Sequence, residues 1–331
     1  EIMPSLVGSE MCIRDRNMAA SEATGAAQIV ALGEPMVEFN QVRPGEPSYL
    51  QGFGGDTSNA IIAAARQGAR TAYLTRVGSD TWGDALMALW RAEGVATDGV
   101  ARDAQAPTAV YFVTHDGDGH AFSYLRAGSA ASRMVPAGLP RDTIEGARFL
   151  HVSGISQAIS ASACDTVFEA IAIARAKGVQ VSYDANLRLK LWPLARARAV
   201  IRETVGLSDL FLPSIEDAQQ FTGLDGEEAI LDWCFEAGAR TVVLKLGKAG
   251  AVLATPSSRE RIAGHAVQAV DATGAGDCFA GSLLARLVAG DAIAQAVRYA
   301  NAAAALTTTG FGAVAPIPRP QDVRGLLARA A

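Results

Sequence analysis

Apolar residues recur along the chain in short continuous runs that alternate with segments of helical pattern. Runs such as "QIVALG" (28–33) are typical of strands buried on both faces of a sheet. Strands alternating with helices indicate a parallel sheet with crossover helices. The expected strands are 28–33, 71–78, 148–153, 179–184, 209–212, 240–246, 250–255 and 260–264. The expected helices are 58–69, 80–94, 161–176, 194–205, 215–221, 227–237, 275–289, 291–308 and 321–330.

Two segments interrupt this alternation. Residues 36–52 place Pro-Gly turn chemistry between strand-like pieces, and residues 108–126 have β-rich arms around "DGDG". We expect both to form a small β lid beside the main sheet. "DGDGH" lacks the later ligands and the terminal glutamate of a calcium loop, so a plain turn is the better interpretation.

The N-terminal segment has a different character. Residues 1–27 show no strand or helix period and no apolar core of a signal peptide. We therefore expect a disordered or non-native tail over 1–27, followed by one domain over 28–331.

Composition narrows the function classes. The 331 residues carry a formal net charge of −5, which argues against a broad nucleic-acid surface but permits a local basic pocket. The four cysteines (12, 164, 234 and 278) are scattered without a C-x-x-C pair, which argues against disulfides and zinc and favours a cytoplasmic protein. No apolar run reaches the length of a membrane span.

One glycine-rich turn carries the clearest chemistry. "DATGAGDCF" (271–279) leads into an expected helix, and Gly274 and Gly276 let backbone N–H groups converge where an anion is favoured. Asp277 beside them either caps the helix or accepts the proton of a hydroxyl that attacks a phosphate. Phe279 replaces the third glycine of G-x-G-x-x-G, and no P-loop motif is present.

Two spaced signatures resemble those of the ribokinase-like (phosphofructokinase B) sugar kinases. "DATGAGDCFAGSLL" is similar to the C-terminal signature, and "GFGGDTSNAIIAAARQGA" (52–69) with "RVGSDTWGDALM" (76–87) to the N-terminal one. The resemblance covers about residues 28–320 and implies an α/β fold, an αβα sandwich with a mostly parallel sheet and a β lid. It implies that Asp277 is the catalytic base and that Gly274, Ala275 and Gly276 form the anion hole.

The acceptor is expected to be a sugar acid. "GEPMVEF" has Glu38 where many relatives have an aspartate, and the combination with "GGDTSNA", "FSYLRAGSAAS" and "DANLR" looks most like 2-keto-3-deoxygluconate kinases. Arg126 and Arg188 near the ends of strands would suit a carboxylate, although each could be a surface residue and Arg188 could serve the ATP phosphates. The expected substrate-binding residues are Gly55, Asp56, Asn59, Tyr111, Tyr124, Arg126, Arg188 and Asp277.

The resemblance also assigns a nucleotide side. "LFLPSIEDA" (210–218) matches an N-x-x-E segment with Ser214 and Asp217 substituted, so Asp217 would order water around Mg²⁺. "KLGKAG" (245–250) resembles the turn over the nucleotide, and 308–318 would flank adenine. The expected ATP-binding residues are Asn186, Arg188, Ser214, Lys245, Gly247, Gly250, Gly274, Gly276 and Asn301. The implied cofactors are ATP and Mg²⁺, with a monovalent cation as an option.

Three alternatives remain open from the sequence. Another sugar kinase of this family, such as a fructokinase, differs only in its acceptor. A non-catalytic sugar sensor would not need the base in "GAGD". A structural role could coexist with catalysis, because lid strands with open edges could pair across a dimer. We therefore expect a homo-oligomer, formed through the lid, that binds a sugar acid and ATP but no nucleic acid or membrane.

Overall fold

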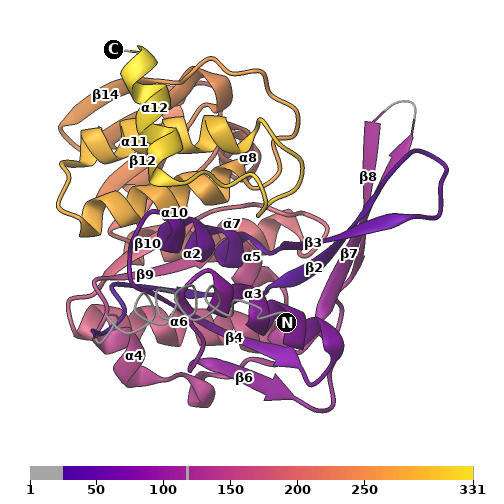
Figure 1. The fold of residues 1–331 in the computed structure, drawn as a ribbon. Coiled ribbons are helices and arrows are strands. Elements are labelled where there is room, and N and C mark those ends of the chain that lie inside the picture. Colours follow the sequence, from indigo (N-terminus) through magenta and orange to yellow (C-terminus); the bar gives the residue numbers. More distant parts are fainter. Residues whose placement is uncertain (1–24, 117–118, 331) are drawn as a thin grey trace, which may run out of the picture.

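The computed structural model describes residues 25–116 and 119–330. A large sheet runs through the middle of the protein, and a smaller four-stranded sheet projects from one side of it (Figure 1). The large sheet has the strand order β14-β13-β12-β11-β10-β9-β1-β4-β5, with β6 paired to β4. The neighbouring strands from β12 to β5 all pair parallel, as does β6 with β4, whereas the β12–β13 and β13–β14 pairs are antiparallel.

The elements have the following bounds. The large sheet contains β1 (Ile29–Leu32), β4 (Thr71–Gly78), β5 (Val95–Ala96), β6 (Val100–Asp103), β9 (Phe149–Ser153), β10 (Gln180–Asp184), β11 (Leu210–Phe211), β12 (Thr241–Lys245), β13 (Gly250–Thr255) and β14 (Ser258–Ala263). The helices are α2 (Asp56–Arg66), α3 (Thr81–Ala92), α4 (Arg141–Glu145), α5 (Gly154–Ala158), α6 (Ala161–Ala176), α7 (Leu194–Leu207), α8 (Ile215–Thr222), α9 (Glu227–Glu236), α10 (Ala275–Val288), α11 (Ile293–Thr307) and α12 (Pro320–Ala330). Short 3₁₀ turns occur at Ala131–Arg133, Pro136–Gly138 and Gly247–Ala249.

The two faces of the large sheet are each covered by helices. Alternate residues of a strand face opposite ways, so Ile29 and Ala31 of β1 join one apolar cluster, whereas Val30 and Leu32 join the other. The first cluster contains α2, α3, α10, α11 and α12, and the second contains α4, α6, α7, α8 and α9. The predicted αβα sandwich is therefore confirmed, and the continuously apolar strands are explained by burial on both faces.

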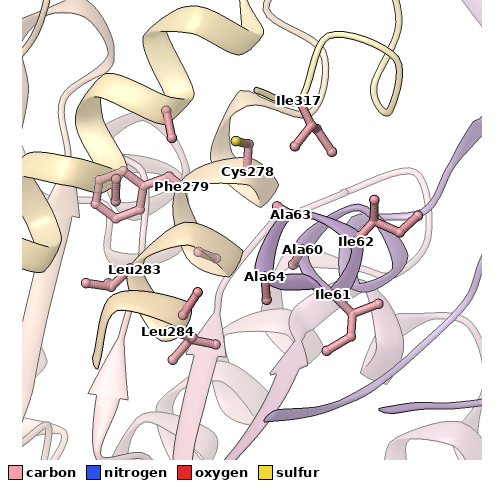
Figure 2. Close-up of a cluster of buried hydrophobic side chains, with 14 of the residues drawn as sticks. Ala60, Ile61, Ile62, Ala63, Ala64, Cys278, Phe279, Leu283, Leu284 and Ile317 are labelled. Carbon is pink, nitrogen blue, oxygen red and sulfur yellow. The ribbon is translucent and has the colours of Figure 1, made fainter. Parts of the chain in front are cut away.

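Helices α2 and α10 pack very closely on one face of the sheet. Figure 2 shows the small side chains Ala60, Ala63 and Ala64 on the side of α2 that faces α10. A Cβ on Gly281 would lie 2.0 Å from the carbonyl oxygen of Ala60, so only glycine permits this approach. The contact holds the N-terminal ends of the two helices together, and both ends carry predicted site residues.

The predicted lid is also confirmed. It is a four-stranded sheet of order β3-β2-β7-β8, built from β2 (Met36–Gln41), β3 (Tyr49–Gly54), β7 (Ala109–Asp116) and β8 (Gly119–Leu125). Strand β2 pairs antiparallel with β3 and parallel with β7, which brings together residues that are 73 positions apart in sequence, such as Glu38 and Tyr111. The centre of the predicted "DGDG" turn, residues 117–118, lies outside the described residues. Residues 1–24 of the expected tail also lie outside them.

Several elements were not predicted from the sequence. Strands β5 and β6, helices α4 and α5 and the 3₁₀ turns are each five residues or shorter. Segments of that length show too little periodicity to be recognised. At the N-terminal end of the described chain, the Arg70 Nε donates to the Ala26 carbonyl at 3.1 Å, so residues 25–27 contact the domain.

Candidate active site

The predicted site residues lie where strands of the large sheet end and where α2 and α10 begin. Strands β10 and β12 end at Asp184 and Lys245, and the first turns of the two helices carry Asp56 and Asp277. The carboxyl ends of parallel strands meet at one edge of a sheet, which is where ligands bind in open α/β folds. Residues from distant parts of the sequence are thus brought together.

Asp277 lies in the first turn of α10 and points to α2. Its Oδ2 accepts a hydrogen bond from Nδ2 of Asn59 at 2.8 Å. The N-cap of α10 is Gly274, with φ of 76° and no side-chain cap. The interpretation of Asp277 as a helix cap is therefore wrong, because its carboxylate is used by a tertiary contact. This turn requires glycine at position 274 for two reasons. The φ of 76° favours glycine, and a Cβ there would lie 2.8 Å from the Ala313 carbonyl oxygen.

The electrostatic surroundings make Asp277 a suitable base. Removal from bulk water raises the pKa of Asp277 to about 7, with the negative charges of Asp56 and Asp184 acting in the same direction. The hydrogen bond from Asn59 and the charge of Lys245 oppose this rise. A carboxyl with a pKa near the working pH accepts a proton efficiently in a transition state. The geometry thus favours the proton-acceptor role over the capping role.

Four polar side chains form a connected group around Asp277. Lys245 Nζ lies 2.5 Å from Asp184 Oδ2, and Asn186 Nδ2 donates to Asp56 Oδ2 at 2.9 Å. The Asn186 backbone N–H also donates to Asp184 Oδ1 at 3.2 Å. Asn186 has a φ of 33°, the one positive φ of a non-glycine residue in the described chain. Unusual backbone conformations of this kind concentrate at functional sites.

Two residues of this region were missed in the sequence, Asp184 and Glu34. Asp184 ends the predicted strand 179–184 and opens "DANLR", so its place at a strand end was the available signal. Glu34 follows β1 and is fully buried, which no local pattern indicates. In contrast, Asn59 was predicted as a substrate ligand, and the structure places its amide on Asp277.

The expected nucleotide side shows a mixture of contacts. The Ser214 hydroxyl caps α8 by accepting from Asp217 N at 3.1 Å. Asp217 Oδ2 accepts from Leu187 N at 3.1 Å, and burial raises the pKa of Asp217 while the nearby charge of Arg188 lowers it. These contacts leave Oδ1 of Asp217 for other ligands.

A resident metal cage is absent from the described residues. No group of three or more His, Cys, Asp or Glu side chains there could hold an ion. Mg²⁺ commonly binds through one or two carboxylates, several waters and substrate phosphates. The single carboxylate of Asp217 fits an ion that arrives with a nucleotide, in keeping with the expected contact through water.

Two of the expected ATP ligands, Gly250 and Asn301, have structural contacts of their own, whereas Gly247 does not. A Cβ on Gly250 would lie 2.1 Å from the Ile262 carbonyl oxygen, so β13 and β14 require glycine there. Asn301 Nδ2 donates to the carbonyls of Ile262 and Ala263, both at 3.2 Å. Gly247 has open space around its Cα and a φ of 56°. Packing thus accounts for Gly250, and the nucleotide roles of all three remain predictions.

The lid places a pair of polar side chains above the strand ends. The Tyr111 hydroxyl donates to the buried Glu38 carboxylate, and the rings of Tyr111 and Tyr124 stack at 5.8 Å. A Cβ on Gly54 would lie 2.6 Å from the Tyr111 hydroxyl oxygen, so β3 leaves room for this pair. Burial raises the pKa of Glu38, and the Asp271 charge adds to that effect. The lid residue that departs from the family pattern is therefore buried at the site.

The expected convergence of Arg126 and Arg188 is not supported. Arg126 forms an ion pair with Glu34, whose carboxylate also accepts from the Ser129 hydroxyl. Arg188 is exposed, lies near Asp217, and its Nη1 donates to the Leu187 carbonyl at 2.8 Å. The two arginines thus have different partners. Arg188 lies with the predicted nucleotide residues.

The fold is thus an αβα sandwich with a β lid, in which a glycine-rich turn leads into α10 and Asp277 lies in the first turn of that helix. The chain matches the pfkB family carbohydrate kinases over residues 26–320, and it belongs to that family. It is thus an ATP-dependent carbohydrate kinase. No helix among the described residues has the length and apolar character needed to cross a membrane.

Relatives with two different acceptors in their names match at similar identity. Fructokinase-2 of Solanum habrochaites is 32% identical, over 94% of this chain and 99% of its own. The 2-dehydro-3-deoxygluconokinase of Thermoproteus tenax is 34% identical, over 92% and 95%. The crystal structure of a Vibrio cholerae fructokinase with fructose, ADP and calcium is 32% identical, with a TM-score of 0.84 over 91% and 99%. The similarity establishes a sugar kinase without choosing the sugar.

Proposed function

We propose that this kinase transfers the γ-phosphoryl group of ATP to the terminal hydroxyl of 2-keto-3-deoxygluconate, giving 2-keto-3-deoxy-6-phosphogluconate. Asp277 takes the proton of that hydroxyl as the oxygen attacks the phosphorus, and the bond from the γ-phosphorus to ADP breaks. The backbone N–H groups at residues 274–276 stabilise the charge that develops on the phosphoryl oxygens.

The observation that carries the choice of a sugar acid is the position of Arg126. Its side chain is 11% exposed, at the end of lid strand β8 and next to the Tyr124 ring. Its Nε is buried and has no hydrogen-bond partner among the described residues. A guanidinium has five N–H donors, and the pairing with Glu34 uses one edge only. The remaining donors suit a substrate carboxylate.

Other groups at the site suit the hydroxyls of the same substrate. Asn59 Oδ1 is buried without a partner among the described residues, and its Nδ2 is held by Asp277. A hydroxyl that reaches Asp277 would thus find an acceptor beside it. The similarity to 2-dehydro-3-deoxygluconokinases of Thermoproteus tenax and Bacillus subtilis, at 34% and 32% identity, also supports this acceptor class.

Fructose is the second candidate acceptor. The fructokinases of several plants and of Vibrio cholerae match this chain at a similar identity. Arg126 could then serve only to neutralise the buried Glu34 carboxylate. The two candidates differ in whether a charged group on the acceptor improves its use.

The test is an acceptor panel for the purified chain with ATP: 2-keto-3-deoxygluconate, its galactonate-derived epimer, fructose and ribose. We expect kcat/KM for a keto sugar acid to exceed that for fructose by at least tenfold, since one charge-assisted hydrogen bond contributes about 1.5–3 kcal/mol. Arg126→Lys, which keeps the charge but loses the planar fork, should reduce this preference. A higher kcat/KM for fructose than for either acid would make the protein a fructokinase.

A further inference from the structure

The side-chain ammonium of Lys245 lies at the N-terminal end of α10, where the proposed reaction places the transferring phosphoryl group. Lys245 ends β12, and a Cβ on Gly276 would lie 3.4 Å from its Nζ. The Lys245 side chain is only 14% exposed, so the ammonium is directed into the site. The positive charge of Lys245 therefore lies close to Gly276, one of the residues expected to form the anion hole.

The position of this ammonium is set by Asp184. The Lys245 Nζ to Asp184 Oδ2 distance is 2.5 Å, and the Asp184 side chain is 6% exposed. Asp184 is fixed on its other side, since its Oδ1 accepts from the backbone N–H of Asn186. Asn186 is in turn tied to Asp56 on α2. A carboxylate fixed by the backbone in this way holds a flexible lysine in one place.

The charges around the site call for such a cation. Asp56, Asp184 and Asp277 place three carboxylates near the position of an anionic substrate. Asp56 and Asp184 raise the pKa of Asp277, and the positive charge of Lys245 lowers it. An ammonium has three N–H donors, and the pair with Asp184 uses one of them. The others can meet phosphoryl oxygens, and a charged donor at that point lowers the barrier more than a neutral one.

We propose that Lys245 is a catalytic residue that donates to the transferring phosphoryl group, and that Asp184 is the positioning residue that holds its ammonium there. This inference rests on the kinase reaction at Asp277 but not on the identity of the acceptor. No bond to Lys245 forms or breaks. It stabilises charge that moves from the acceptor oxygen and phosphoryl group to the leaving ADP.

Two substitutions test the pair, Lys245→Met and Asp184→Asn. We expect Lys245→Met to lower kcat by about 10²–10³-fold, the usual loss for one preorganised donor to a transition state, with little change in acceptor KM. Asp184→Asn should lower kcat less, because the ammonium remains but is less well held. Lys177→Met, which removes an exposed lysine charge at the end of α6, is the matched control and should leave kcat unchanged.

The pH profile provides a readout that a purely structural role would not move. The groups that act on Asp277 are Asp56 of α2, Asp184 of β10 and Lys245 of β12, and Tyr111 of the lid lies near. Loss of the positive charge in Lys245→Met should move the acid limb of kcat/KM to higher pH. Loss of the negative charge in Asp184→Asn should move it to lower pH.

The outcomes separate this inference from the proposed acceptor. All variants are assayed with whichever acceptor the wild-type chain uses best. If the proposed acceptor is wrong, the acceptor panel shows it, and the ratios of variant to wild-type kcat are unaffected. Near wild-type kcat in Lys245→Met, or acid limbs that move in the same direction in both variants, would overturn the proposal. If Lys245→Met fails to fold by circular dichroism, Lys245→Gln decides, because it removes the charge and keeps a polar side chain: kcat near the wild-type value in that variant would overturn the proposal.

Discussion

Around Asp277 the polar side chains form hydrogen bonds and ion pairs with one another, whereas in the lid some polar groups have no such partner among the described residues. Asn59 donates to Asp277, and Lys245 pairs with Asp184, all on elements of the main sandwich. In the lid, Tyr124 is 39% exposed and the Nε of Arg126 has no hydrogen-bond partner among the described residues. This difference fits our proposal, in which the groups at the main-sheet end carry out phosphoryl transfer and the unused donors of the lid bind the acceptor. Substitutions at the two ends should therefore differ in which kinetic constant they change.

The largest effect is expected at Asp277. Asp277→Asn keeps the size of the side chain but removes the proton acceptor, so kcat should fall by about 10²–10⁴-fold. Nucleotide affinity, measured by calorimetry, should stay close to that of the wild-type chain. Turnover near the wild-type rate would show that Asp277 has no part in proton transfer.

The same variant should be more stable than the wild type at pH 8. The pKa of Asp277 is about 7 in the folded chain, above its ordinary value, so folding favours the protonated carboxyl. Stability from this group is present at low pH and is lost as the pH rises through the folded pKa. An asparagine avoids that loss. The free energy of unfolding should match the wild type near pH 4 and exceed it by a few kcal/mol at pH 8, as measured by urea denaturation.

At the lid end, Arg126→Ala should affect both stability and acceptor binding. It leaves the Glu34 carboxylate, whose side chain is fully buried, without its ion pair, at a cost of about 3–5 kcal/mol in the free energy of unfolding. It should also raise acceptor KM with less effect on kcat.

The double variant Glu34→Gln/Arg126→Ala separates these two roles. Replacing the carboxylate removes the unpaired charge, so thermal melting should show much of the stability restored while acceptor KM stays high. Restoration of both quantities would mean that Arg126 serves only Glu34.

A smaller effect is expected from Gly54→Ala in β3. The added methyl would lie 2.6 Å from the Tyr111 hydroxyl oxygen and should displace it from Glu38. We expect a loss of about 1–3 kcal/mol in stability and a higher acceptor KM. Gly325→Ala in α12 is the matched control, because its methyl meets open space and a helical alanine is slightly stabilising. Equal KM values in the two variants would remove the Tyr111–Glu38 pair from acceptor binding.

The smallest expected effect is a shift in a pH profile. Asp56 is the largest of the charge effects that raise the pKa of Asp277. Asp56→Asn should move the acid limb of kcat/KM to lower pH by about one unit or less. An acid limb that does not move in Asp56→Asn, followed from pH 5 to 9, would show that the limb belongs to another group.

The sequence alone determined the fold class and indicated Asp277 as the candidate base. The periodicity of strands and helices is local, and the central strands of the large sheet, such as β1 and β9, are apolar enough to show burial on both faces. The lid was recognised because its segments break that rhythm. Asp277 was found because a glycine-rich turn before a helix favours an anion, so a carboxylate there required an explanation. These signals depend on neighbours in the sequence, which is why they could be found without a structure.

Only the tertiary structure decided which polar groups meet. Asp184 and Lys245 are 61 residues apart, and Asn59 and Asp277 are 218 apart. Their contacts exist because parallel strands end at one edge and because α2 packs on α10. The sequence led us to expect Arg126 beside Arg188, but in the folded chain Arg126 pairs with Glu34. This contact, too, depends on the tertiary structure. Ion pairs and hydrogen bonds depend on distances in space. The pattern of residues along the sequence does not predict them until the order of the strands in the sheet is known.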